Sequence, residues 1–175
     1  MVEIYYHDGD DAVDFRQPHN SGEPVPEQHL AEIGVFYRFC PTQDQVDAVA
    51  KERGYKNRDV VAISESTMGE ALLPKLQAFY AEHLHEDEEI RYCIDGEGYF
   101  DVRDASDDRW IRCRVTPGDL LVLPAGIYHR FTLTDANQIT ALRLFKDEPK
   151  WVAHNRPDAD TRPVRKDYLA SLATN

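Results

Sequence analysis

Cysteine is scarce in this sequence, and positive charge is in deficit. The 175 residues include 3 cysteines, Cys40, Cys93 and Cys113. Their odd number and the lack of a CxxC spacing argue against a disulfide framework or a cysteine-ligated zinc site, so we expect buried, reduced thiols. Lysine and arginine number 20 against 32 aspartates and glutamates, which gives a formal net charge of −12. Because such a chain repels nucleic-acid phosphates, we expect no nucleic-acid partner.

Long apolar runs are also missing. No stretch is apolar enough to cross a bilayer, and Glu3, His7 and Asp8 interrupt the region where a signal peptide needs an apolar core. We therefore expect no membrane partner and a cytoplasmic location, with access to a nucleus left open. Neither a repeat nor a linker divides the chain, so we expect residues 1–175 to form a single domain and a monomer.

Turn residues divide the second half of the chain into short β-rich runs. These runs cover residues 90–94, 99–103, 110–115, 120–123, 128–133 and 140–145. Short strands at this spacing predict a small antiparallel barrel, so the expected fold class is mainly β with a few flanking helices. We place the barrel core at about 83–146 and a packed tail after it, with one or two helical turns over 166–172.

The first half predicts fewer strands and more helix. Residues 2–6 alternate weakly as a strand, and the next two dozen are typical of a surface loop. Thr42 and Gln45 form a capping-box pattern, and helical spacing then continues to Gly54. A second helix is expected from Leu73 and Pro74 toward His83. The predicted helical N-terminal part therefore covers about residues 40–82.

Two separated stretches carry the residues that suit a metal. Residues 82–92 contain His83, His85, Glu89 and Arg91, and residues 124–129 end in His129. If residues 82–92 formed one extended strand, the side chains of His83, His85, Glu89 and Arg91 would lie on the same face, because alternate residues of a strand point the same way. Three imidazoles and one carboxylate suit Fe, Ni, Co, Mn or Zn and leave positions open for a substrate. The alternative for an HxH pair beside acidic residues is a solvated loop.

The spacing around these residues resembles the two motifs of the cupin superfamily. Glu89 is followed at the motif distance by Gly96, and Gly118 leads through Pro124 and Gly126 to His129. This resemblance implies a jelly-roll barrel that holds a metal inside. Two positions depart from the general pattern, since Gln77 stands in place of Gly and Leu133 in place of Asn.

A narrower resemblance is carried by the segments EHLHEDEEIRYCIDGEGYFDVRD (82–104), PAGIYHRFTL (124–133), ALRLF (141–145), NRP (155–157) and, upstream, LLPKLQAFYAEH (72–83). Together these segments resemble the acireductone dioxygenase family of methionine salvage, in its eukaryotic form. The resemblance implies that the metal ligands are His83, His85, Glu89 and His129. It also implies one divalent ion per chain, Fe²⁺ or Ni²⁺, with Co²⁺ as a further possibility.

The same resemblance implies the reaction. The substrates would be O₂ and the acireductone 1,2-dihydroxy-3-keto-5-methylthiopentene. An iron form would give formate and 2-keto-4-methylthiobutyrate, whereas a nickel or cobalt form would give methylthiopropionate, formate and carbon monoxide. Two other classes stay open: a non-redox cupin isomerase, which would need several cations for a phosphate, and a binding cupin without catalysis.

Further residues near the expected site allow two interpretations each. Arg91 lies two residues after Glu89, so in a strand its side chain points to the same face as that of Glu89. Arg91 is our candidate catalytic and substrate-binding cation, and the alternative is a structural ion pair. Phe131 and Phe79 are candidate contacts for the methylthio tail, although core packing explains either one as well. The acidic residues 86–88 could form a solvated turn, or one of them could hydrogen-bond to the second ring nitrogen of a ligand histidine. We expect His7, His19, His29 and His154 to be surface or packing residues.

Overall fold

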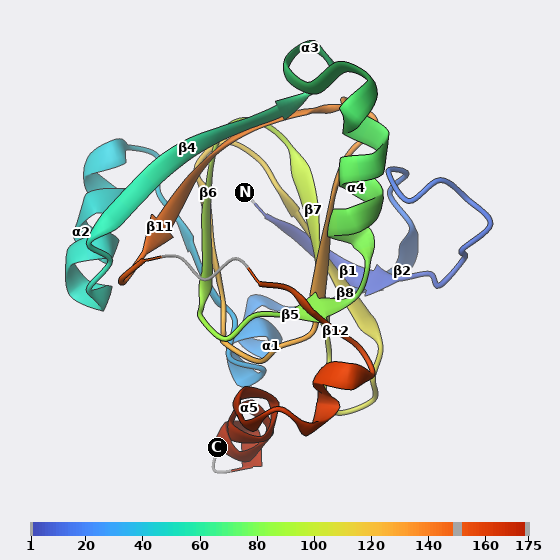
Figure 1. Cartoon of the computed structure of the whole chain (residues 1–175), viewed down its shortest axis with the longest axis vertical. Helices are drawn as coiled ribbons and strands as arrows, with labels where there is room; N and C mark the ends of the chain where they lie inside the picture. The colour runs from blue at the N-terminus through green and yellow to red at the C-terminus, as the bar shows by residue number, and fades with distance from the viewer. Residues whose placement is uncertain (1, 149–151, 174–175) are drawn as a thin grey trace.

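Two antiparallel sheets enclose the core of the computed structural model, which describes residues 2–148 and 152–173 (Figure 1). One sheet has seven strands in the order β12-β5-β10-β7-β8-β1-β2, and the other has five in the order β3-β9-β6-β11-β4. The strands are β1 Glu3–His7, β2 Asn20–Pro24, β3 Phe36–Phe39, β4 Asn57–Ser64, β5 His83–Leu84, β6 Glu89–Gly96, β7 Gly98–Arg103, β8 Trp110–Val115, β9 Asp119–Leu123, β10 His129–Leu133, β11 Gln138–Phe145 and β12 His154–Asn155. The predicted mainly β barrel with flanking helices is confirmed.

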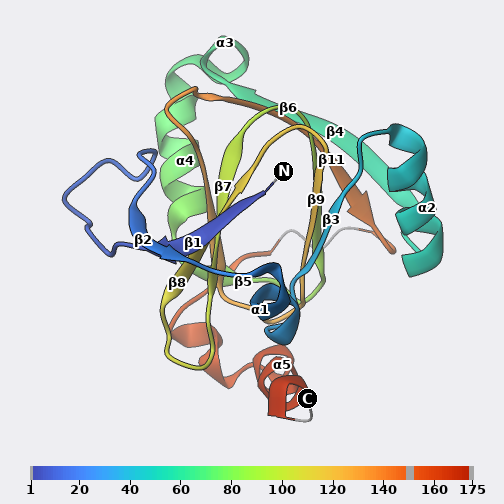
Figure 2. The same cartoon turned by 180° about the vertical axis from the view of Figure 1, so that it is seen from behind.

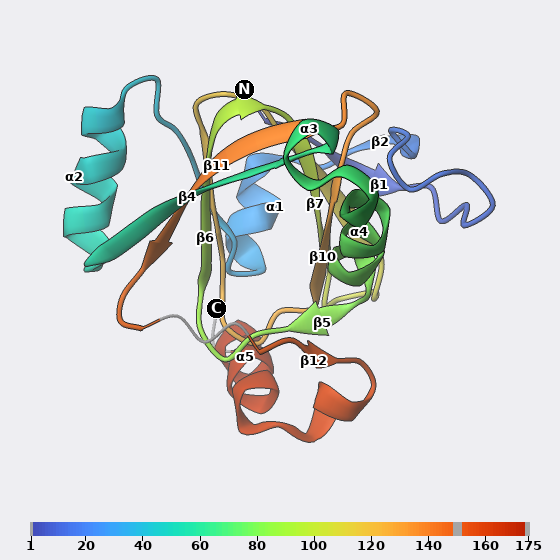
Figure 3. The ribbon, with the colours of Figure 1, turned by 45° about the horizontal axis from the view of Figure 1, so that its top comes forward.

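Helices lie around the barrel and not within it. Figure 3 shows α2 outside the five-stranded sheet and α4 on the opposite flank, while Figure 2 shows α5 at one end of the barrel. The helices are α1 Glu27–Glu32, α2 Gln43–Arg53, α3 Glu65–Met68, η1 Gly69–Ala71, α4 Leu72–Tyr80, η2 Asp158–Thr161 and α5 Pro163–Ala173. Within the described residues, every helix is too short or too polar to span a membrane.

The predicted helix after Thr42 is confirmed, with the predicted ends. Thr42 is the N-cap, and Gln45 completes a capping box with it. Gly54 ends α2 in the left-handed conformation, with φ of 78°. The apolar face of α2 is buried against the outer side of the five-stranded sheet, so this helix closes a second small core there.

Strand β6 separates core residues from site residues by strict alternation. Ile90 and Tyr92 belong to the apolar cluster beneath α2. Glu89 and Arg91 therefore face the opposite way, into the barrel, where both line the larger cavity. This is the side-chain parity that the sequence predicted for the second half of the metal-binding stretch.

Three expectations about local structure are wrong. Residues 82–92 do not form one strand, because β5 ends at Leu84 and β6 begins at Glu89 in the other sheet. Residues 57–64, which we expected near helices, form β4 and pair along their whole length with β11. Part of the expected surface loop forms the exposed strand β2, which pairs with β1.

Candidate metal centre

Three histidines meet inside the barrel. His83 lies on β5, His85 directly after it, and His129 begins β10. One ring nitrogen of each lies within 4.8 Å of the others. The pairing of His83 with His129 across neighbouring strands brings the two sequence stretches together. A backbone hydrogen bond from Gly126 to the carbonyl of His85, at 3.1 Å, joins the same stretches a second time.

Backbone carbonyls hold the outer nitrogen of each ring. Nδ1 of His83 lies 2.6 Å from the carbonyl oxygen of Ala81, and Nδ1 of His129 lies 3.0 Å from that of Ile127. His85 uses the carbonyl oxygen of Val152 in the same way, at 3.0 Å. Because a carbonyl oxygen only accepts, each Nδ1 donates its proton, and each Nε2 keeps a free lone pair. This is the tautomer that binds a metal through Nε2.

Glu89 completes the group from β6. Its Oε2 lies 2.7 Å from Nε2 of His129, yet neither atom makes a hydrogen bond within the described part of the chain. Two buried acceptors that face each other without a donor are unfavourable unless a cation lies between them. The donor set and its orientation therefore fit a divalent metal ion.

The protonation states also suit a metal. Burial lowers the pKa of His83 to about 4, and it lowers the pKa of His85 as well. Burial alone would raise the pKa of Glu89, but the charge of Arg91 and the contact with His129 outweigh it and hold that pKa well below its usual value. At neutral pH His83 and His85 are thus neutral and Glu89 is ionised, as metal ligation requires.

Arg91 pairs with the same carboxylate. Its Nη2 lies 2.8 Å from Oε1 of Glu89, on the side away from His129. On the neighbouring strand, Arg143 stands opposite Arg91 in register and forms a two-pronged pair with Asp59 at 2.7 and 2.6 Å. The structural ion pair that the sequence left open for Arg91 therefore exists, but its partner is the candidate ligand itself.

A cavity of about 690 Å³ lies beside the three histidines and is mainly apolar. Phe79 of α4 and Phe131 of β10 both line it, with their rings edge to face at 6.0 Å. Phe131 also packs against Phe100 at 4.8 Å. The wall contributed by residues 61–68 was missed in the sequence, because β4 was missed. The continuous apolar run VVAI at 60–63 is the sequence signal for this strand.

The acidic residues after His85 are not partners of the ligand histidines in the described structure. Glu86 is exposed and lies 3.5 Å from Arg162. Glu88 accepts from the hydroxyl of Tyr55 at 2.8 Å and lies 3.1 Å from Lys146. Of our two interpretations, the solvated turn describes these residues better.

A second pair of histidines, at the N-terminus, has a different role. His7 and His19 stack with ring centroids 4.5 Å apart and an interplanar angle of 11°. His19 uses both ring nitrogens, one toward Asp8 and one toward the carbonyl of Asp14, each at 2.8 Å. One ligand atom each of His7, Asp8 and His19 lies within 4.8 Å of the others, but every nitrogen of both rings already has a hydrogen-bond partner within the protein. We therefore interpret the two histidines as packing residues, as the sequence predicted.

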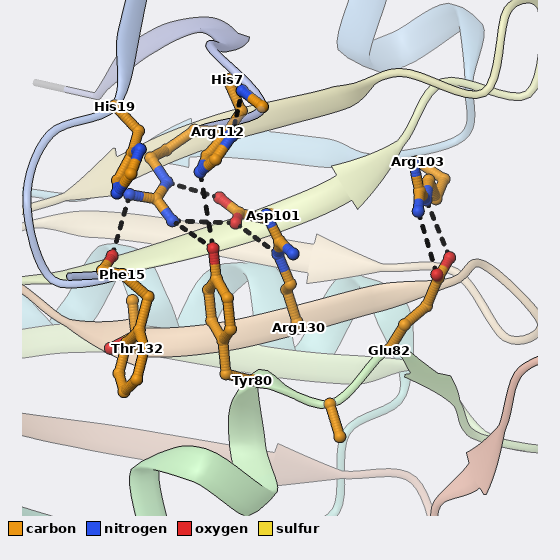
Figure 4. A network of polar contacts seen from close by, with 12 residues as sticks. His7, Phe15, His19, Tyr80, Glu82, Asp101, Arg103, Arg112, Arg130 and Thr132 are labelled. Atoms are coloured by element: carbon orange, nitrogen blue, oxygen red, sulfur yellow. Dashed lines mark hydrogen bonds and ion pairs between the residues drawn. The ribbon is translucent and has the colours of Figure 1, made fainter. Parts of the chain in front are cut away.

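A buried charge network supports the strand that carries His129. Asp101 of β7 accepts from Arg112 at 2.7 and 2.9 Å and from Arg130 at 2.7 Å (Figure 4). Arg130 follows His129 on β10, and its guanidinium stacks on Tyr80 of α4 at 4.0 Å. The network thus ties β10 and α4 together on the face behind the candidate centre.

Comparison with known proteins gives consistent matches. The model of the ARD/ARD′ family matches residues 3–153. Acireductone dioxygenase of Saccharomyces cerevisiae is 59% identical over 98% of each chain, and that of Emericella nidulans is 55% identical over 98% of this chain and 96% of its own. The structure of acireductone dioxygenase from Bacillus anthracis, with a cadmium ion in its active centre, superposes with a TM-score of 0.69 at 26% identity, covering 87% of this chain and 97% of that one.

Proposed function

Because the chain belongs to the ARD/ARD′ family, it is a metal-dependent acireductone dioxygenase of methionine salvage, and we propose that His83, His85, His129 and Glu89 form its metal centre. One observation carries this proposal: the buried Nε2 of His129 and Oε2 of Glu89 face each other at 2.7 Å without a hydrogen bond among the described residues. The other two histidines offer their Nε2 atoms to the same space.

The donor set narrows the choice of ion. Three imidazole nitrogens and one carboxylate oxygen suit Fe²⁺ or Ni²⁺, and Co²⁺ as well, and such an ion would keep positions open for substrate oxygens. We propose one such ion per chain. A bound ion would supply Lewis acidity and fix the two chelating oxygens of the enediol. Following the family resemblance, we infer that iron leads to the keto acid and formate, and that nickel or cobalt leads to methylthiopropionate, formate and carbon monoxide.

The residues of the chain bind and orient the substrate. Arg91 lies next to Glu89 inside the cavity, so its guanidinium is placed to donate a charge-assisted hydrogen bond to the anionic enediolate. Phe131 and Phe79 line the apolar part of the same cavity, where ring edges favour contact with the sulfur of the methylthio tail. The apolar lining also excludes water from the reacting carbons.

The carbonyl contacts hold the histidines in the orientation that the chemistry requires. Each Nδ1–H points at a backbone oxygen, so the rings cannot turn or change tautomer without losing a hydrogen bond. The rival classes, a cupin isomerase and a binding cupin, have no support from the family matches.

We further propose that the protein is a cytoplasmic monomer, small enough at 20.1 kDa to be found in the nucleus as well. Its three cysteines are free and buried, as suits a reducing compartment. Size-exclusion chromatography with light scattering tests the monomer, and fractionation of cells that express the tagged chain tests the location.

The direct test of the reaction adds purified protein, loaded separately with iron and with nickel, to enzymatically generated acireductone under air. Loss of substrate absorbance should exceed the spontaneous rate, and the two forms should differ in carbon monoxide release. If neither form consumes substrate faster than buffer, the proposal is wrong. The matched control is the Glu89→Gln chain treated with the same metal.

A further inference from the structure

Two cavities reach the proposed metal centre. Besides the apolar cavity of about 690 Å³, a smaller one of about 280 Å³ lies between residues 85–91 and residues 145–148, which include the last residue of β11 and the three that follow it. His85, Glu89 and Arg91 line both cavities. The centre is thus reached from two directions, with these three side chains between them.

The two cavities carry opposite charge. The side chains that line the smaller one include six carboxylates and two cations, Arg91 and Lys146. The larger one is lined by three cations, Lys75, Arg91 and Arg143, and by one carboxylate, Glu89. Two of these three cations are already paired, Arg91 with Glu89 and Arg143 with Asp59. A hydrated cation is therefore attracted to the acidic smaller cavity and not to the larger one.

Three carboxylates carry most of the uncompensated charge of the smaller cavity. Asp87, Asp147 and Glu148 are exposed, and none forms an ion pair with any residue of the segments 2–148 and 152–173. Glu88, in contrast, lies 3.1 Å from Lys146 and 3.7 Å from Arg53, so its charge is largely balanced. The three unbalanced carboxylates lie on opposite walls, two of them just after β11 and one in the turn before β6.

An acidic surface alone would say little, but this cavity is also lined by Glu89, whose buried Oε2 has no hydrogen-bond partner among the described residues. The side chain of His129 is 4% exposed, and its free Nε2 is aimed at Oε2 of Glu89. Of the three histidines, only His85 lines the smaller cavity, and it is also the least buried of the three. An ion that arrives from this side therefore meets His85 and Glu89 first and the two deeper histidines afterwards.

We propose that the smaller cavity is the route by which the divalent ion reaches the centre, separate from the cavity that takes the substrate. Asp87, Asp147 and Glu148 attract the hydrated ion to its mouth, and His85 and Glu89 receive it. The inference rests on the metal centre proposed above, but it does not depend on the reaction that the centre performs.

The test measures the rate of metal uptake by the full-length, metal-free chain. Co²⁺ is mixed with protein at low ionic strength, the reaction is stopped with chelator at successive times, and protein-bound cobalt is measured by elemental mass spectrometry after desalting. The mouth variant carries Asp87→Asn, Asp147→Asn and Glu148→Gln. Its matched control carries Asp11→Asn, Asp135→Asn and Glu70→Gln, which removes the same charge from exposed positions elsewhere.

The mouth variant should take up cobalt at least about threefold more slowly than wild type, with an unchanged dissociation rate, and salt should reduce the difference. The control should load at the wild-type rate. Equal slowing of both variants, or a wild-type rate in the mouth variant, would refute the route. Faster loading in Lys75→Glu, with no effect of the mouth variant, would place uptake in the larger cavity instead. A wild-type chain that binds no cobalt would refute the metal centre itself.

Discussion

His83 and His129 are paired directly across β5 and β10, although they come from separate stretches of the sequence. Each hydrogen-bonds through Nδ1 to a carbonyl two residues before it in its own chain segment, Ala81 and Ile127 respectively. The same local geometry is therefore used twice, and the strand pairing places the two copies side by side. The proposed metal centre is thus largely built into the sheet, and it takes only Glu89 and His85 from outside this pair.

Replacing Glu89 by Gln should remove the metal while keeping the shape of the side chain. The amide has no charge to offset a divalent ion, and its nitrogen cannot act as a ligand. Loss of a residue that only hydrogen-bonds to a metal ligand lowers metal affinity by up to about 100-fold. Loss of a ligand should cost more, so we expect affinity to fall by at least about 100-fold. Elemental analysis after dialysis against a weak chelator measures it. Glu88→Gln, one residue away but bound to Tyr55 and Lys146, should keep one metal per chain.

Replacing Arg91 by Ala should separate binding of the metal from binding of the substrate. Glu89 keeps its contact with His129, so metal content should stay near one per chain. Loss of one hydrogen bond from a charged donor, about 1.5–3 kcal/mol, lowers kcat/KM by roughly 10- to 150-fold. Steady-state kinetics on the metal-loaded variant measures this. Loss of metal at unchanged activity per bound ion would instead make Arg91 a purely structural partner of Glu89.

The sequence alone predicted correctly the features that depend on a single strand or helix. Strand β6 needs only alternation to place Ile90 under α2 and Glu89 in the barrel. Helix α2 needs only its capping box and its terminal glycine. In both cases the information lies within about ten neighbouring residues, where periodicity and end signals operate.

The sequence could not predict the features that depend on pairing between strands far apart in the chain. Strand β5 has only two residues, and it exists because β10 and β12 pair with it on either side. The break between β5 and β6, which sends them to different sheets, follows from those pairings. The partner of Nδ1 in His85 is the carbonyl of Val152, a group that every residue carries and that no side-chain pattern marks. The side-chain alternation assumed for one strand therefore pointed to residues that do line one cavity, although that strand is not continuous.

Phe131→Leu should reduce selectivity for the methylthio tail. The Phe131 ring packs so closely against Gly98 that a Cβ there would lie 2.7 Å from it, and Phe131 lines the larger cavity. Leucine keeps the apolar volume but removes the ring edge that favours sulfur, which is worth up to about 1 kcal/mol, or about fivefold in kcat/KM. Kinetics with acireductone and with an analogue that lacks the methylthio group measure the effect. An equal loss for both substrates would contradict a contact with the tail.

The stability of the metal-free protein should fall below neutral pH, in part through His7. Burial lowers the pKa of His7 to about 4, whereas an unfolded histidine titrates near about 6.5. Between these two pKa values the unfolded chain binds more protons than the folded protein. The stabilising contribution of neutral His7 is therefore full above about pH 6.5 and is lost as the pH falls. By linkage the loss at pH 5 is about 2 kcal/mol. Urea unfolding measures how much the free energy of unfolding falls between pH 7.5 and pH 5. This fall should be smaller by about 2 kcal/mol in His7→Gln than in wild type, and an equal fall in both would contradict burial of the neutral ring.

Asp101→Asn should be among the most destabilising changes that leave the cavity lining intact. Asp101 is 1% exposed and is the carboxylate shared by Arg112 and Arg130, so its loss leaves two buried guanidiniums without a counter-charge. Breaking a buried pair in this way costs about 3–5 kcal/mol.

The matched control is Asp59→Asn, which breaks a two-pronged pair of equal geometry with Arg143 on the surface, where Asp59 is 45% exposed. Exposed pairs contribute less than about 1 kcal/mol, because water and salt screen them. Urea unfolding of the two metal-free variants gives the comparison directly. A similar, small loss in both would mean that the backbone carbonyls and aromatic rings around Arg112 and Arg130 already stabilise these charges without Asp101.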